Sequence, residues 1–83
     1  MDDDALLAVC RTTCRRVMAR SGASVDQAKA ATRVELHRAG FDVALDDQEL
    51  TDGLPMILVT LADGRCVCWT ETGGWTVRRL PVP

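Results

Sequence analysis

The segment MILVTLADGRCVCWTETGGWTVRRL (residues 56–80) decides the fold, because it holds three short apolar runs separated by two turn-forming groups. These runs, each with the length and side-chain types of a strand, cover about residues 56–61, 66–70 and 75–80. The pair Asp63-Gly64 is typical of a two-residue type I′ hairpin turn, and we centre the second turn on Thr72-Gly73. The segment therefore predicts an antiparallel meander.

Two-residue turns would fix which side chains share a face of this sheet. They pair Leu61 with Cys66 and Thr70 with Trp75, and directly opposed residues lie on the same face. We expect the core face to hold Ile57, Val59, Leu61, Cys66, Cys68, Trp75 and Val77. The other face then holds Met56, Leu58, Thr60, Val67, Trp69, Thr76 and Arg78. This register predicts that Trp75 is buried and that Trp69 is more exposed.

The preceding residues predict two helices and one more strand. The first helix is expected over about residues 3–21, with a buried stripe of Leu6, Leu7, Cys10, Cys14, Val17 and Met18. The second, over about 25–39, begins at a capping box of Ser24 and Gln27. Its stripe is Val25, Ala28, Thr32, Leu36 and Ala39. Alternation in FDVAL predicts a strand over about 41–45.

These elements predict a single small α+β domain over residues 1–83. Two N-terminal helices would pack on one face of a three- or four-stranded antiparallel sheet. Between the strands, residues 46–55 form an acidic loop with Asp46, Asp47, Glu49 and Asp52. Their spacing does not match an EF-hand loop, so we expect a solvated charge run rather than a calcium site.

Four cysteines raise the question of a metal site. On the predicted register, Cys10 and Cys14 from the first helix and Cys66 and Cys68 from the sheet all point into one core. Four thiolates would suit zinc, but their spacing is not that of a zinc knuckle. A disulfide would need an oxidising compartment. We expect free core thiols, no metal and no cofactor, because buried cysteine behaves as a small hydrophobe.

Composition bounds the class of protein. The net charge of −2 and the 47% hydrophobic content are ordinary for a soluble domain, and no apolar run is long enough to span a membrane. The acidic start, MDDDALLAVC, differs from a signal peptide, so a cytoplasmic location is expected. Nine arginines against one lysine, with no asparagine, suggest a high-GC bacterium or its phage.

The predicted outer face is the leading candidate site. Met56, Leu58, Val67, Trp69 and Arg78 would leave apolar side chains on a face that should be polar. Such a patch marks a protein interface, unless a terminal segment, the acidic loop or the first helix folds over it. We expect a non-enzymatic interaction or regulatory module that docks a partner protein or a second copy of itself.

A nucleic-acid-binding regulator is the alternative. Its basic surface would be built from Arg11, Arg15, Arg16, Arg20 and Arg33 of the two helices. Two helices followed by a strand hairpin also resemble a winged-helix layout. The acidic overall balance opposes this hypothesis. An enzyme is not expected, because the single histidine, His37, has no nucleophile or carboxylate placed beside it.

Overall fold

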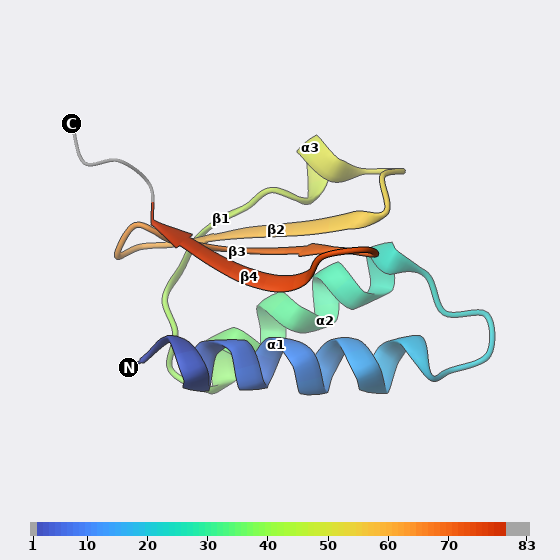
Figure 1. The fold of residues 1–83 in the computed structure, drawn as a ribbon, viewed down its shortest axis with the longest axis horizontal. Coiled ribbons are helices and arrows are strands. Elements are labelled where there is room, and N and C mark those ends of the chain that lie inside the picture. The colour runs from blue at the N-terminus through green and yellow to red at the C-terminus, as the bar shows by residue number, and fades with distance from the viewer. Residues whose placement is uncertain (1, 80–83) are drawn as a thin grey trace.

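A helical layer lies against one side of a four-stranded sheet in the computed structural model, which describes residues 2–79 and, at Leu45, Asp46 and Gln48, the backbone (Figure 1). The elements are α1 (Asp3–Met18), α2 (Val25–Arg38), β1 (Val43–Asp46), α3 (Gln48–Thr51), β2 (Met56–Leu61), β3 (Arg65–Thr70) and β4 (Gly74–Arg79). The predicted α+β arrangement of two N-terminal helices and an antiparallel meander is confirmed. Residue 80, the expected end of the last strand, lies outside the described residues.

Both long helices begin where their sequences predict, and α2 ends within one residue of its prediction, whereas α1 ends at Met18, about three residues before the predicted end at residue 21. The Asp2 side chain caps α1 by accepting from the Ala5 backbone N–H at 2.7 Å. Ser24 and Gln27 form the capping box of α2, with both bonds at 3.2 Å. Gly40, at φ +92°, ends α2, because its left-handed backbone lets the Phe41 N–H reach the Leu36 carbonyl at 2.9 Å.

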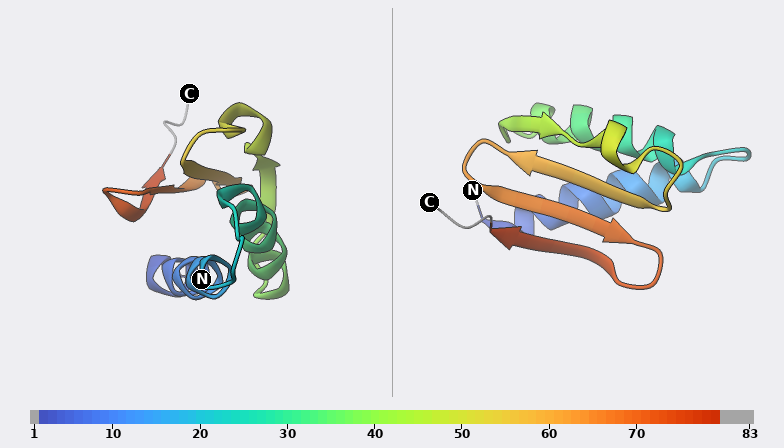
Figure 2. Two further views of the ribbon diagram at one scale, coloured as in Figure 1. Left: turned by 90° about the vertical axis from the view of Figure 1, so that its right-hand side faces the viewer. Right: turned by 90° about the horizontal axis from the view of Figure 1, so that it is seen from above.

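The four strands lie in chain order, β1-β2-β3-β4, and α1 and α2 cover one face of their sheet (Figure 2). The short helix α3 lies on the opposite side, over the start of β2 (Figure 1). It falls inside the segment that was predicted to be a solvated acidic loop. The sheet therefore has an inner face toward the long helices and an outer face toward α3.

The predicted register is wrong by one residue in both hairpins. Thr60, not Leu61, pairs with Cys66, and Thr70 pairs with Gly74 rather than with Trp75. In each hairpin, the pairing of the two strands is thus shifted by one residue relative to the prediction. Two such shifts cancel for β2 and β4, which keep their predicted faces, but they turn β3 over.

The physical reason is the backbone of the turn residues. A type I′ turn needs positive φ at both central residues, whereas no non-glycine residue in the described chain has positive φ. Gly64 alone takes the left-handed conformation in the first turn, at φ +92°, after Ala62 and Asp63. This is the pattern of a three-residue loop closed by a glycine bulge.

The observed inner face consists of rows of opposed residues across β2, β3 and β4. One row is Val59, Val67 and Val77, and the next is Ile57, Trp69 and Trp75. The core joins these rows to Leu6, Cys10, Cys14 and Val17 of α1, Ala28 and Leu36 of α2, and Phe41. Trp69 and Trp75 are therefore neighbours on one face, both half-buried, and their predicted separation is wrong.

The helix stripes also differ from prediction at several positions. Met18 is 41% exposed and Ala39 is exposed, whereas Thr13 and Lys29 are buried. Thr13 falls on the buried side of α1, between α1 and α2. Polar residues at these two positions hide the stripe from an analysis that counts hydrophobic residues alone.

Candidate interaction surfaces

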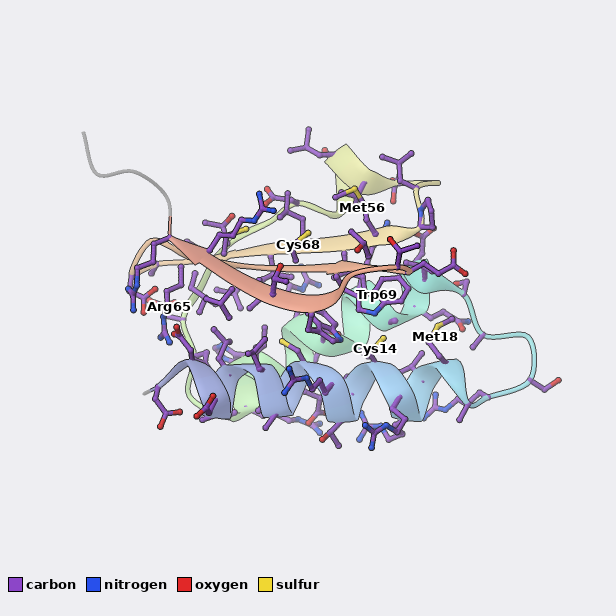
Figure 3. All side chains as sticks on the ribbon, in the orientation of Figure 1. Cys14, Met18, Met56, Arg65, Cys68 and Trp69 are labelled. Atoms are coloured by element: carbon purple, nitrogen blue, oxygen red, sulfur yellow. The ribbon has the colours of Figure 1, made fainter. Side chains whose placement is uncertain are left out.

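The residues predicted to form the partner-binding surface are divided between the two faces of the sheet. Met56 and Leu58 are half-buried on the outer face, and Arg78 is exposed there. Val67 is completely buried and Trp69 packs against the core, so both are excluded from an outer surface. Figure 3 shows Met56 on the side of α3 and Trp69 on the side of the long helices.

Cysteines replace the two lost residues on the outer face. Cys68 lies between Leu58 and Thr76, and Cys66 lies between Thr60 and Arg78. The prediction that all four cysteines share one core is therefore wrong. Cys10 and Cys14 point in, and Cys66 and Cys68 point out (Figure 3 labels one of each pair). Because the sheet separates the two pairs, all four sulfurs cannot ligate a single tetrahedral ion.

Burial makes the inner thiols poor nucleophiles. It raises the pKa of Cys10 to about 12, with a further increase from neighbouring Cys14. Burial also raises the pKa of Cys14, against a smaller opposing effect of the hydrogen bond from the Trp75 indole. On the outer face, burial raises the pKa of Cys66, and a hydrogen bond with Thr60 opposes it. Thiolates, the reactive and metal-binding form, are thus disfavoured at these three positions.

The segment around α3 covers part of the outer face. The buried Asp47 carboxylate accepts a hydrogen bond from the Thr60 hydroxyl at 3.1 Å, which fixes the start of α3 against β2. Thr60 lies beside Cys66, whose sulfur is 3.9 Å from the hydroxyl. The predicted alternative, in which the acidic loop folds over the outer face, is therefore correct for this corner.

A buried lysine holds the other end of α3. Lys29 is 1% exposed, and its ammonium donates to the Thr51 carbonyl at 2.6 Å and to Asp26 at 3.0 Å. The bond to Thr51 joins α2 in the helical layer to α3 across the end of the sheet. With Asp47 at one end and Lys29 at the other, α3 is fixed in place rather than solvated.

This anchored helix presents the most exposed large apolar residue in the described chain. Leu50 of α3 is 73% exposed, and Leu54, in the loop that leads to β2, is 48% exposed. Met56 follows two residues later and is half-buried. Leu50, Leu54, Met56, Leu58 and Cys68 together define what we call the α3 patch. Leu50 was missed because a single leucine among acidic residues has no periodicity to identify it.

A second polar cluster surrounds Arg65 at the opposite end of the sheet. Its guanidinium lies 2.7 Å from Asp63, 3.2 Å from Asp3 and 5.7 Å from the centre of the Phe41 ring. The bond from Arg65 lowers the pKa of the Asp63 carboxyl. A shallow groove of about 410 Å³ borders this cluster. Because two carboxylates already neutralise Arg65, the cluster ties the hairpin to α1 and does not form an anion site.

The helical arginines do not form one basic surface. Arg11, Arg15, Arg16, Arg20 and Arg33 are all exposed, as predicted. However, Arg16 points toward α2, where Glu35 lies 3.7 Å away and also pairs with Arg38 at 3.2 Å. Helical spacing places Arg11 and Arg15 on the other flank of α1. The positive charge is therefore dispersed, and part of it is neutralised.

Other classes of site have little support in the described residues. His37 is exposed, and no hydrogen bond or ion pair joins its imidazole to another of the described side chains. Among the side chains that the structure describes, which leave out those of residues 45, 46 and 48, no group of three or more potential ligands is arranged to hold a metal ion. None of the helices in the described part of the chain combines the length and the apolar character that crossing a bilayer requires. Compared with protein-family models, curated proteins and solved structures, the chain gives no match.

Proposed function

We propose that the protein is a non-enzymatic interaction module that docks a protein partner through the α3 patch. The observation that carries the proposal is Leu50, 73% exposed on a helix fixed by Lys29 and Asp47. Because the backbone that carries Leu50 is already fixed, little further backbone entropy is lost when a partner covers this side chain. Exposed apolar groups on a rigid support are typical of interaction sites.

The neighbouring residues give this patch the composition of an interface. Half-buried Met56, Leu58 and Cys68 form an apolar floor, while Thr76 and Arg78 supply a polar rim toward β4. Apolar centres with polar rims, and enrichment in methionine and arginine, characterise protein interfaces. A second copy of the chain is the simplest partner, because a two-fold axis lets one patch cover its equivalent.

The test compares two matched variants, Leu50→Glu and Val34→Glu. Both replace an exposed apolar side chain on a helix by a carboxylate, but Val34 lies on α2, away from the outer face, at 46% exposure. Sedimentation velocity at several concentrations measures self-association of each. We expect Leu50→Glu to weaken it about tenfold or more, as loss of a central interface residue does, and Val34→Glu to leave it unchanged.

If the wild-type chain is monomeric, the same variants serve as baits for a protein partner. A candidate captured from the source cells by wild type and Val34→Glu, but not by Leu50→Glu, is then purified and titrated against all three. Saturable binding lost with Leu50→Glu supports the proposal. A monomeric chain with no partner that distinguishes the two variants contradicts it.

The nucleic-acid alternative has less support from the geometry. Its arginines lie on separate flanks of α1, and Glu35 neutralises part of their charge. Arg11→Glu combined with Arg15→Glu tests it, since a phosphate-binding surface would lose affinity and salt dependence together. The α3 patch predicts no effect of that double variant.

A further inference from the structure

The outer face of the sheet is covered on one side only. Helix α3 lies over its β1–β2 side, and no other described element lies over β3 and β4 (Figure 2). On this uncovered side Cys68 is half-buried and its neighbour Thr76 is exposed. With Leu50 73% exposed, α3 therefore forms a ridge that stands above the sheet beside a lower strip made by β3 and β4. The ridge of one copy has a place to lie on the strip of another.

The charges on the two sides of this face are opposite in sign. Glu49 of α3 and Asp52, which follows it, are exposed, and Arg78 is exposed near the end of β4. None of these three side chains forms an ion pair with another of the described side chains. By sequence, residues 45, 46 and 48 include no basic side chain, and residues 80–83 include no charged one. The ridge is therefore acidic, and the strip is basic at the Arg78 end.

This distribution of charge selects a second copy of the chain as the occupant. A basic partner protein would be repelled by Arg78, and an acidic one would be repelled by Glu49 and Asp52. A second copy offers the opposite charge at both places. A two-fold axis between the two outer faces forms each of these contacts twice.

We propose that two copies pack outer face to outer face, with α3 of each lying on β3 and β4 of the other. This inference rests on the proposed function of the α3 patch and adds to it the partner and the pairing of charges. Glu49 and Asp52 of one copy would lie beside Arg78 of its partner, and Leu50 would be covered by the β3–β4 strip.

The two ends of β4 determine how the copies are turned relative to each other. Glu71 is exposed in the turn that precedes β4, whereas Arg78 lies near the opposite end of the strand. If α3 of the partner lay over the turn, its carboxylates would face Glu71, and like charges oppose association. The orientation that brings α3 toward Arg78 is therefore favoured.

Reversing the charges in two separate variants tests this pairing. One variant carries Glu49→Arg with Asp52→Arg, and the other carries Arg78→Glu. Each variant alone places like charges at both contacts, so its self-association should be weaker than that of the wild type by about tenfold or more. In an equimolar mixture, both contacts of a mixed dimer again join opposite charges. Native mass spectrometry should therefore detect mixed dimers, and sedimentation velocity should give an affinity within about threefold of the wild type.

Two further variants serve as controls. Arg15→Glu makes the same charge change at an exposed position of α1, away from the outer face, and should leave self-association within about threefold of the wild type, as expected for a distant screened charge. Arg78→Gln removes the attraction without adding repulsion and should weaken self-association less than Arg78→Glu. All substituted positions are exposed, and circular dichroism confirms that each variant is folded.

Mixed dimers formed from two variants that are each monomeric support the proposal. A wild-type chain that stays monomeric overturns it, although the proposed function then stands if a different protein binds the α3 patch. Self-association that Leu50→Glu abolishes but that mixing the two variants does not restore overturns the charge pairing and leaves the α3 patch in place. Self-association that Leu50→Glu does not change contradicts both.

Discussion

The two sides of β3 are close to equal in apolar character and different in role. Val67 and Trp69 point inward and pack in the core, whereas Cys66 and Cys68 point outward, toward α3 and the open face. Either pair would be acceptable in a core, since cysteine is buried about as often as valine. The composition of a strand therefore does not determine its orientation when both of its faces are apolar; turn length does.

The largest expected effect comes from placing a charge on each side of β3 in turn, at two adjacent positions. Val67→Asp places a carboxylate in a completely buried site, and we expect a loss of at least about 3–5 kcal/mol, enough to unfold a small domain. Cys68→Asp, on the half-buried outer side, should cost roughly 1 kcal/mol. Urea denaturation followed by circular dichroism measures both. A larger loss for Cys68→Asp would restore the register predicted from sequence.

A second experiment tests whether the two tryptophans lie on the same face of the sheet. Because Trp69 and Trp75 are directly opposed and half-buried, each alanine substitution should cost about 2–4 kcal/mol. Their double-mutant cycle should give a coupling of about 0.5–1.5 kcal/mol, as for an aromatic pair in contact. A cycle of Trp75→Ala with Met56→Ala, on the opposite face, is the control and should give none. Zero coupling between the tryptophans would mean that they lie on opposite faces.

The smallest expected effects concern thiol chemistry on the two sides of the sheet. Cys68 should be alkylated first by iodoacetamide at pH 8, Cys66 more slowly, and Cys10 and Cys14 at a rate limited by unfolding, because they are buried. Mass spectrometry of peptides over time gives the order. Rapid modification of Cys10 in the folded chain would contradict its burial.

The free energy of unfolding should depend on pH through Cys10, and urea denaturation at several alkaline pH values measures this dependence. The folded-state pKa of Cys10, about 12, lies above that of an unfolded cysteine near 9. Its contribution to stability is therefore complete below pH 9 and is lost as the pH rises toward 12. Cys10→Ala should remove that part of the alkaline loss of stability.

The sequence predicted where helices and strands lie along the chain better than it predicted how the strands pair. The capping box of Ser24 and Gln27 and the apolar run 56–61 located α2 and β2 to within one residue at either end. The face of β3 was predicted wrongly because Asp63-Gly64 fits two turn types, and the bond from Arg65 to Asp63 favours the longer one. The site was only partly predictable, since the helix that carries Leu50 is held by the bond from Lys29 to the Thr51 carbonyl, which joins residues 22 positions apart.

The strand order has a consequence for how the chain folds. Every pairing in the described sheet joins strands that are consecutive along the chain, so each hairpin can form without waiting for a distant segment. The packing of α1 on β4 is different, because it unites the first and last elements and includes the contact between Cys14 and Trp75. Closing that contact brings together elements from the two ends of the described chain. We therefore expect the α1–β4 contact to form late, after the meander, so that weakening it accelerates unfolding more than it slows folding.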